Sequence, residues 1–368
     1  MRKIAFFVSN LSSGGAERVC VNLANFISKK DEVAVYLISH FGGGYDSLVN
    51  HEVHRIETSN KSLFSLVKEI KNTQFDVIMS TLPSCNVRLV MMKPFLNSKT
   101  LYLTRACNVL YPWYRKESAA IWKGHLVSYL DHRSYLLSDY AIANSPDTAA
   151  SMRRICMIPE NRIFTIGNPV TPPKKEIKAI SQTKFPFKYI LAVGNLRPQK
   201  RYDLMLDAFK IIANETDLHL CVLGEGMERK MIEEKIRNLK LEERVHLLGS
   251  QKEIGSYYEN AECFIHSAQF EGFGNVFVEA LSYGAVPICF NCQGGPNYIL
   301  DKGKYGVLVP FGNVEELAEG VINVVNGKRV FNKEELRKRA EFFSIQEKGE
   351  EYYNLFKTLY EKKNRETF

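Results

Sequence analysis

Two glutamates, Glu271 and Glu279, lie eight positions apart in an apolar stretch that reads FEGFGNVFVEALSYGAVPICF, residues 270 to 290. A glycine turn, Gly272 to Asn275, separates them. The order of these residues predicts a strand, then a loop that carries Glu271, then a helix that Asn275 caps at its N-terminus. Glu279 would then stand in the second turn of that helix.

The start of the predicted helix determines what the two glutamates can bind. Free N–H groups at a helix N-terminus favour an anion such as a phosphate. Because carboxylates repel phosphate oxygens, we expect Glu271 and Glu279 to bind neutral hydroxyl groups on either side of the anion. Sugars supply such hydroxyls, a ribose for one glutamate and a hexose for the other. The stretch therefore predicts a site for a sugar linked to a diphosphate.

A second candidate site is the basic loop in VGNLRPQKRYDLML, residues 193 to 206. Arg197, Lys200 and Arg201 follow a predicted strand, and a helix is expected from about Tyr202. Ligands of parallel α/β sheets bind beyond the C-terminal strand ends, so cations at this place suit a diphosphate. A solvated basic loop without a ligand is the alternative.

A third candidate is the glycine turn in SNLSSGGAERV, residues 9 to 19, directly after the first predicted strand. Gly14 and Gly15 let the backbone approach a ligand, and a helix from about Ala16 offers N–H groups to an anion. The turn matches neither GxGxxG nor a P-loop, which argues against a dinucleotide or ATP. An ordinary turn is the alternative.

The elements that must position these loops alternate along almost the whole chain, short apolar segments with longer helical ones. Such alternation predicts an α/β fold with parallel sheets covered by helices on both faces. In the first half we expect strands at Ile4–Val8, Val33–Ile38, Val77–Ser80, Thr100–Leu103 and Tyr140–Ala143. In the second half we expect them at Tyr189–Val193, His219–Leu223, Val245–Leu248, Cys263–His266, Val286–Cys289 and Val307–Val309.

A chain of 368 residues exceeds what one hydrophobic core usually organises, so two domains are expected. The alternation breaks at residues 168 to 188, which are rich in proline and lysine. We predict a Rossmann-like domain at residues 1–170, a linker at 171–188 and a second Rossmann-like domain at 189–345. Residues 346–368 are predicted to form a C-terminal helix able to pack back on the first domain.

The composition, 45% hydrophobic and 24% charged residues, is that of a globular rather than a disordered protein. No segment is apolar over the length of a membrane span, so we expect a cytoplasmic protein. The net charge of +8 favours anionic partners, but no zinc finger, RRM signature or basic helix indicates nucleic acid. Cys289 and Cys292 have CxxC spacing without the further ligands of a metal site, so no metal is predicted.

Residues 271 to 279 resemble the E-x7-E motif of retaining GT-B glycosyltransferases, specifically family 4. The segments EGFGNVFVEALSYGAVPI and GGPNYIL are similar to the donor site of that family. The shorter segments GGAERV, VGNLRPQKRYD, VLGEG and RVHLLG occur in the family's order and at its spacings. The resemblance covers residues 3 to 325, and it implies two Rossmann-like domains that face each other across a cleft.

The resemblance also implies a role for each matching residue. Arg197 and Lys200 would hold the donor diphosphate, and Glu271 would hold hydroxyls of the transferred sugar. Glu279 would bind the ribose, while His246 and Leu247 lie where the family packs its nucleobase. Further donor contacts are implied for Gly14, Gly15, Gly272, Phe273, Gly274, Asn275 and Val276.

Two positions depart from the family's pattern. Many members have arginine where this chain has Asn195, and Arg197 is the candidate for that charge. Members often carry a histidine or arginine in a loop of the first domain where this chain has Ala106. We expect Arg105 and Asn108 to stand on the acceptor side instead.

The implied reaction breaks a sugar–diphosphate bond through an oxocarbenium-like state while charge builds on the leaving phosphate. Cations and helix N–H groups stabilise that charge, so we expect neither a metal nor a cofactor. The departing phosphate can take the proton of the acceptor, and a covalent intermediate on Glu271 is the less favoured alternative. The relatives implied by the motif build bacterial surface polysaccharides or lipid-linked oligosaccharides, so a UDP-hexose or UDP-N-acetylhexosamine donor and a glycan or lipid-linked acceptor are expected.

Both tryptophans, Trp113 and Trp122, fall in a stretch where aromatic and basic residues interleave. Such a stretch suits the surface of an anionic membrane, here the cytoplasmic face of the inner membrane, where a lipid-linked acceptor would be found. Ordinary core packing with a solvated face is the alternative. Two other functions also stay open: a sugar-nucleotide epimerase of the same architecture and a non-catalytic sugar-nucleotide-binding subunit.

Overall fold

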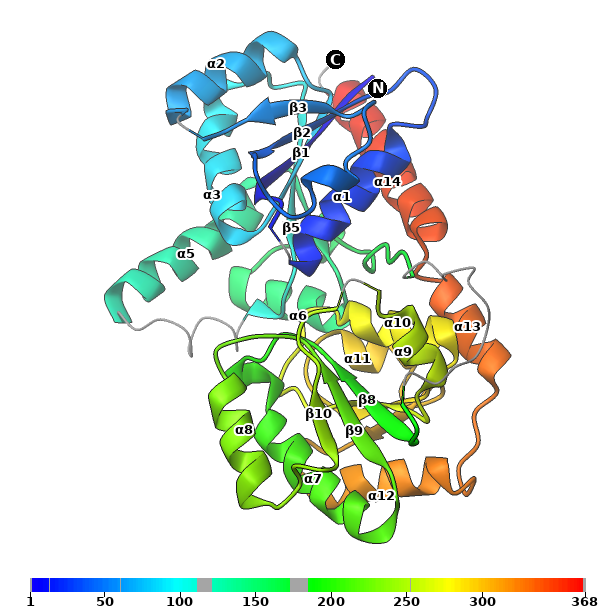
Figure 1. Ribbon diagram of the computed structural model, residues 1–368. Coiled ribbons are helices and arrows are strands. Elements are labelled where there is room, and N and C mark those ends of the chain that lie inside the picture. The colour runs from blue at the N-terminus through cyan, green and yellow to red at the C-terminus, as the bar shows by residue number, and fades with distance from the viewer. Residues whose placement is uncertain are drawn as a thin grey trace. The chain divides into compact units, whose positions relative to one another are not determined.

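The computed structural model describes residues 2–12, 14–59, 61–110, 121–172, 185–251 and 253–366, with the side chains of residues 121–128 and 366 left out. The chain forms two compact units (Figure 1). The first unit contains Met1–Val170 together with Phe343–Phe368, and the second contains Thr171–Phe342. Each unit is built around its own parallel sheet.

The first unit contains a seven-stranded sheet whose described strands follow the order β3-β2-β1-β4-β5-β6-β7. All of its pairings are parallel. The order reverses between β1 and β4, which is the arrangement of a doubly wound Rossmann-like fold. The strands are β1 (Lys3–Asn10), β2 (Ala34–His40), β3 (His54–Glu57), β4 (Val77–Thr81), β5 (Leu101–Ala106), β6 (Tyr140–Ala143) and β7 (Ile163–Thr165).

Helices cover both faces of the first sheet, because alternate residues of its central strand are apolar on both sides. Ile4 and Phe6 of β1 belong to one buried cluster, whereas Ala5 and Phe7 belong to another. Helices α1 and α14 contribute to the first cluster, and α2 and α3 contribute to the second. The helices are α1 (Gly15–Ile27), α2 (Leu63–Thr73), α3 (Pro83–Met92), α5 (Ile121–Leu137), α6 (Pro146–Cys156) and α14 (Ile345–Glu366), with short 3₁₀ turns η1 (Asp46–Leu48), η2 (Lys93–Phe95) and η3 (Glu160–Arg162).

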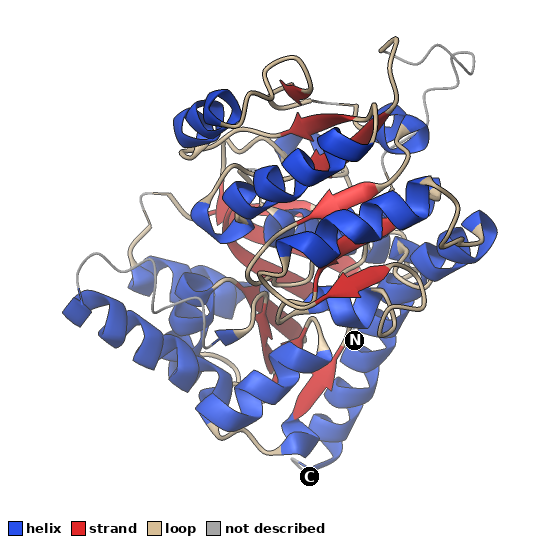
Figure 2. Ribbon diagram, turned by 90° about the horizontal axis from the view of Figure 1, so that it is seen from below, coloured by secondary structure: helices blue, strands red, loops and turns tan. Residues whose placement is uncertain are grey.

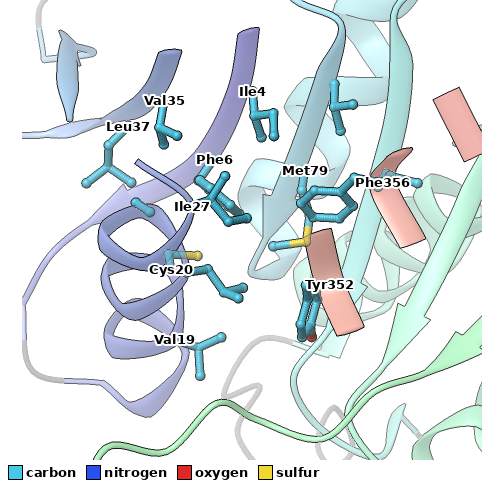
Figure 3. Packing of buried hydrophobic residues seen from close by; sticks show 14 of the residues in the cluster. Ile4, Phe6, Val19, Cys20, Ile27, Val35, Leu37, Met79, Tyr352 and Phe356 are labelled. Carbon is cyan, nitrogen blue, oxygen red and sulfur yellow. The ribbon is translucent and has the colours of Figure 1, made fainter. Parts of the chain in front are cut away.

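The last helix, α14, belongs to the first unit although its sequence follows the second. Tyr352 and Phe356 are fully buried beside Phe6 of β1 and Cys20 of α1 (Figure 3). The C-terminal helix predicted at residues 346–368 is therefore part of the core of the first unit.

The second unit contains a six-stranded parallel sheet in the order β10-β9-β8-β11-β12-β13, with the reversal between β8 and β11. Helix α7 packs on α8 and α12, and helix α10 packs on α9, α11 and α13. Figure 2 shows the strands of each unit with helices on either side. The strands are β8 (Tyr189–Val193), β9 (His219–Leu223), β10 (Val245–Leu247), β11 (Phe264–His266), β12 (Pro287–Phe290) and β13 (Val307–Val309).

The helices of the second unit alternate with these strands, as the sequence predicts. They are η4 (Pro198–Lys200), α7 (Tyr202–Glu215), α8 (Arg229–Asn238), α9 (Gly255–Asn260), α10 (Asn275–Tyr283), α11 (Gly295–Ile299), α12 (Val314–Val325) and α13 (Lys333–Glu341). Among the described residues, no helix is both long enough and apolar enough to pass through a bilayer.

Two strands of the first unit, β3 and β7, are missing from the sequence prediction. Both stand at the edges of the sheet, where a strand has one neighbour and less apolar burial. The strand β3 reads HRIE and the strand β7 reads IFT, so neither shows the apolar run that identifies the central strands.

Candidate functional site

The reversal point of the second sheet brings two of the predicted site loops together. Strands β8 and β11 are neighbours, with Leu191 opposite Phe264, and the connections that follow them lead to opposite sides of the strand order. Ligands of doubly wound sheets bind beyond the C-terminal ends of the strands at such a point. The basic loop follows β8, and the loop that carries Glu271 follows β11.

Two hydrogen bonds tie these loops to each other. The Ser267 hydroxyl donates to the Lys200 carbonyl oxygen at 2.7 Å, and the Gln269 N–H donates to the Gln199 carbonyl oxygen at 2.9 Å. Arg201, the third cation of the basic loop, pairs with a carboxylate of its own helix. It adopts a left-handed backbone conformation, and its guanidinium group binds the carboxylate of Asp203 at the start of α7.

Lys200, Glu271 and His266 form a buried cluster where the two loops meet. The Lys200 ammonium group pairs with Glu271 Oε1, and His266 Nε2 lies 2.9 Å from the same oxygen. The residue Glu271 is only 8% exposed. The structure thus brings together two predicted catalytic residues and adds His266, which the sequence analysis did not single out.

The charges of this cluster follow from its surroundings. Burial by itself raises the pKa of Glu271, but the Lys200 charge and the His266 hydrogen bond outweigh burial and lower it to about 2. Burial and the Lys200 charge both lower the pKa of His266. At neutral pH the cluster therefore consists of an ionised carboxylate, an ammonium group and a neutral imidazole, as expected for a buried charge that is paired and hydrogen-bonded.

The second glutamate, Glu279, has a partner of its own. The Tyr258 hydroxyl on α9 donates to Glu279 Oε2 at 3.2 Å, and the tyrosine is completely buried. Burial and the neighbouring Glu279 carboxylate raise the pKa of Tyr258 well above its ordinary value, so the phenol stays a donor. Glu279 itself is half-buried, with its carboxylate held from one side by Tyr258.

The start of helix α10 differs from the prediction in one respect. Gly274, not Asn275, is the N-cap, and it adopts a left-handed conformation with φ 85°. Asn275 is already the first helical residue, so its side chain is not in the position that capping requires. The expectation that Asn275 caps the helix was therefore wrong, although the helix begins and ends where predicted.

Two further glycines, Gly294 and Gly295, pack against the backbone of the loop that carries Glu271. Gly294 has a φ of +124°, and a Cβ at this position would collide with the carbonyl oxygen of Glu271. The Glu271 N–H donates to the Gln293 carbonyl oxygen at 3.1 Å. A Cβ on Gly295 would meet the carbonyl oxygen of Phe273. The GGPN turn is thus packed directly against the backbone of the glutamate loop, which explains its glycines.

The remaining predicted donor residues of the second unit lie in different environments. Arg197 is exposed in the basic loop, while Gly272 and Phe273 are buried and Val276 is half-buried at the start of α10. His246 stands on the edge strand β10, and Leu247 follows it. His246 Nε2 lies 2.9 Å from His219 Nδ1, and the His246 ring stacks on Phe187. These described partners of His246 are not residues of the Lys200–Glu271–His266 cluster.

In the first unit, the glycine turn is occupied by a side chain of its own helix. Gly14 precedes α1 in an extended conformation, and a Cβ there would collide with the Glu17 carboxylate. Burial raises the pKa of Glu17. Gly14 therefore makes room for Glu17, and a donor phosphate at Gly14 and Gly15, as the resemblance implies, would meet a carboxyl group.

The structure corrects the expectation for Arg105. This residue is only 1% exposed, and its guanidinium group donates to Tyr352, Thr81, Cys107 and Asn168. Because its described hydrogen bonds go to groups inside the first unit, Arg105 supports the core rather than contacting an acceptor. Asn108 is half-buried just beyond β5, and its acceptor contact stays a prediction.

No group of three or more histidine, cysteine, aspartate or glutamate side chains that could hold a metal is found among the described residues. Cys289 and Cys292 are both buried. Burial raises the pKa of Cys289 well above its ordinary value, which makes it a poor thiolate ligand. The aromatic and basic stretch with Trp113 and the side chain of Trp122 lies outside the described residues.

Comparisons with known proteins identify the family of this chain. The family model of group 1 glycosyl transferases matches residues 173–342, and that of glycosyltransferase family 4 matches residues 13–173. The chain belongs to the GT-B glycosyltransferases. The matches meet at residue 173, close to the boundary between the two units at residues 170 and 171.

Individual proteins similar to this chain are distant in sequence but cover nearly its full length. An N-acetylgalactosamine-N,N'-diacetylbacillosaminyl-diphospho-undecaprenol 4-alpha-N-acetylgalactosaminyltransferase of Campylobacter jejuni is 26% identical over 87% of this chain and 89% of its own. HepE of Anabaena, solved with UDP-glucose, has a TM-score of 0.81 at 19% identity, covering 97% of this chain and 100% of its own. The lipopolysaccharide outer core galactosyltransferase WaaB has a TM-score of 0.75 at 19% identity, covering 96% and 98%.

Two residues of the site, His266 and Tyr258, were missed by sequence reasoning. His266 carried a usable signal, because it ends a strand five positions before Glu271. Tyr258 carried none, since it stands on a different helix, 21 positions before Glu279.

Proposed function

We propose that this glycosyltransferase moves a hexose or N-acetylhexosamine from a UDP-sugar to a glycan or lipid-linked acceptor in the synthesis of bacterial surface polysaccharide, with retention of configuration. The observation that carries the proposal is the arrangement around the start of α10. The Lys200–Glu271 ion pair joins the basic loop to the loop that precedes α10, and Glu279, which accepts a hydrogen bond from Tyr258 of α9, stands in the second turn of α10. Together with the helix N-terminus, these groups provide one place for a diphosphate and two carboxylates for hydroxyl groups.

The relatives support the choice of donor and acceptor. HepE was solved in complex with UDP-glucose, and the Campylobacter relative is named for an undecaprenol-diphosphate acceptor. Their identities to this chain are 19% and 26%, so these substrates are carried over as proposals.

The proposed mechanism uses charge rather than a protein nucleophile. As the bond between the sugar and the diphosphate breaks, Lys200, the exposed Arg197 and the N–H groups of α10 stabilise the negative charge on the leaving phosphate. Glu279 holds the ribose, and Glu271 holds hydroxyls of the transferred sugar. The departing phosphate takes the proton of the acceptor hydroxyl on the same face, so the reaction requires no metal ion.

The proposal is tested by measuring product formation from a panel of UDP-, GDP- and ADP-sugars with undecaprenyl-diphosphate-linked saccharides. We expect transfer from a UDP-sugar, unchanged by excess EDTA, with an axial linkage identified by NMR. A GDP- or ADP-sugar as the preferred donor, an inverted linkage or loss of turnover with EDTA would each contradict the corresponding part. Binding of UDP-sugar without turnover on any acceptor would favour the non-catalytic subunit.

We also propose that the first unit contacts an anionic membrane, where lipid-linked acceptors reside. Exposed apolar side chains occur near the end of α3 and along α5: Met91, Phe95, Tyr129 and Leu137. Lys93 joins the two ends by donating to the Leu137 carbonyl oxygen at 2.9 Å. Arg133 lies over the Tyr129 ring, which adds a cation to the apolar surface. Apolar and cationic side chains together suit the interface of an anionic bilayer.

Flotation with liposomes that contain phosphatidylglycerol tests this surface. The double substitution Phe95→Ala with Leu137→Ala should reduce the bound fraction several-fold, and raised salt should reduce it further. Val330→Ala, a substitution at a more exposed apolar residue of the second unit, serves as the control and should bind like the wild type. Equal flotation of both variants would contradict the membrane contact.

A further inference from the structure

The Lys200–Glu271 pair raises a conflict within the proposed site. Lys200 is expected to hold the donor diphosphate, yet in this structure its ammonium group pairs with Glu271. The two side chains are 13% and 10% exposed, so water offers little compensation to either charge if they separate. An arriving diphosphate therefore competes with Glu271 for the same cation.

Separation of the pair would leave the Glu271 carboxylate buried with a smaller set of partners. An ionised carboxylate in such a place is costly unless another group supplies charge and hydrogen bonds. His266 Nε2 already lies 2.9 Å from Glu271 Oε1, the oxygen that Lys200 also contacts. No rearrangement of the backbone is needed for the imidazole to become the main partner.

The groups around His266 allow it to accept a proton at that moment. The Phe277 ring of α10 packs against the His266 imidazole with 5.0 Å between the ring centroids. Cys289 is the neighbour of His266 on β12. Tyr202 of α7 is close enough to feel the charge of Glu271. Burial raises the pKa of both Cys289 and Tyr202, so neither carries charge at neutral pH. Burial and the Lys200 charge oppose protonation of His266, and the Glu271 carboxylate favours it.

We propose that His266 is a positioning residue that replaces Lys200 as the partner of Glu271 when a nucleotide diphosphate binds, and that one proton from solvent enters the imidazole in that step. The inference rests on the proposed function, because it takes the diphosphate of the donor as the ligand of Lys200. The step balances without a further reactant: Lys200 keeps its proton and moves to the phosphate, Glu271 stays ionised, and the imidazole becomes an imidazolium. Donor affinity should therefore rise as the pH falls through the neutral range.

Isothermal titration calorimetry with UDP tests this exchange in the full-length protein. Heats measured at one pH in buffers of different ionisation enthalpy give the number of protons taken up on binding. His266→Gln keeps a hydrogen-bond donor for Glu271 but cannot be protonated, and His51→Gln, at an exposed histidine of the first unit, is the matched control. UDP itself can take up protons, so the quantity of interest is the difference between variants.

The wild type and His51→Gln should take up more protons than His266→Gln, with a difference that approaches one proton. Equal uptake in all three proteins would overturn the exchange while leaving UDP binding, and thus the proposed donor, intact. Failure of UDP to bind the wild type would contradict the proposed donor and the exchange together.

A second measurement does not depend on the histidine variant, and its first part needs no ligand. Titration of the His266 imidazole by NMR should show a higher pKa in Lys200→Met than in the wild type, because the opposing charge is gone. Saturating UDP should move the wild-type value in the same direction. An unchanged or lower value in Lys200→Met would overturn the proposal.

Discussion

Lys200 and Glu271 contribute to the stability of the second unit in a manner that depends on pH. The pKa of Glu271 falls from 4.5 to about 2 in the folded protein, so its contribution is complete above pH 4.5 and is lost as the pH falls through 2. Both side chains are largely buried. Removal of the Glu271 charge at neutral pH therefore leaves the Lys200 ammonium group buried without its carboxylate partner. The same contact therefore serves the fold in the free protein and must be given up when a diphosphate binds.

Glu271→Gln should destabilise the second unit at neutral pH by about 3 kcal/mol, the usual effect of removing one partner of a buried ion pair. The difference from the wild type should shrink as the pH is lowered from 4.5 toward 2, since Glu271 then becomes neutral in both states. Denaturant unfolding followed at several pH values measures this difference. A penalty that is constant across that range would show that the charge of Glu271 is not the cause.

Tyr258 holds the second glutamate, and its removal should affect binding more than chemistry. Tyr258→Phe keeps the buried ring but leaves Glu279 Oε2 without its 3.2 Å hydrogen bond. We expect a several-fold higher KM for the donor with little change in kcat, because the ribose contact is the same in the ground and transition states. Tyr353→Phe, at a half-buried tyrosine of α14 in the first unit, is the control for the loss of a hydroxyl. A fall in kcat at unchanged KM would contradict this role.

The strand order of the second sheet determines which loops form the candidate site. The reversal between β8 and β11 places the basic loop beside the glutamate loop, and the GGPN turn after β12 supports that loop through backbone contacts. Residues from three separate strand ends are thus fixed by parallel pairing.

Gly294→Ala should disturb the glutamate loop, because a Cβ would collide with the Glu271 carbonyl oxygen. Gly327→Ala is a matched control, since Gly327 also has a positive φ, +71°, but nothing lies within 4 Å of its Cβ position. Both variants carry the backbone strain of alanine at positive φ, at least about 1 kcal/mol. Only Gly294→Ala should lose UDP affinity, by tenfold or more in calorimetry. Equal affinities would show that the turn does not support the site.

Apolar periodicity predicted most of the elements but only part of the site. The strands β6, β8, β9 and β13 occupy the residues expected, since each is a nearly continuous apolar run. Arg105 shows why the rest could not be predicted. A cation at a strand end suggests a ligand, but its partner Tyr352 lies 247 positions away and buries it. Likewise, nothing in the local sequence places Tyr258 beside Glu279.

At the scale of the whole molecule, the chain leaves the first unit at residue 170 and returns to it at residue 343. The return is anchored by a bridge between Val170 and Ser344 and by the buried face of α14, which Figure 3 shows against β1 and α1. The first unit therefore depends on residues that follow the second unit in the sequence.

Phe356→Ala should destabilise the first unit by about 3–5 kcal/mol, the usual cost of removing a buried phenylalanine ring. Hydrogen exchange should accelerate in β1 and α1, which pack against Phe356, and remain unchanged in the second sheet. Lys357→Ala, at the neighbouring exposed position, should leave exchange as in the wild type. Equal protection of β1 in both variants would mean that α14 does not hold the first unit together.

The central claim is that the loops after β8 and β11 hold the donor, and hydrogen exchange of the full-length protein with and without saturating UDP tests it most directly. We predict slower exchange at residues 194–201 and 271–279, and an unchanged pattern in β12 and β13, which are already protected. UDP binding that leaves both loops unchanged would contradict the claim.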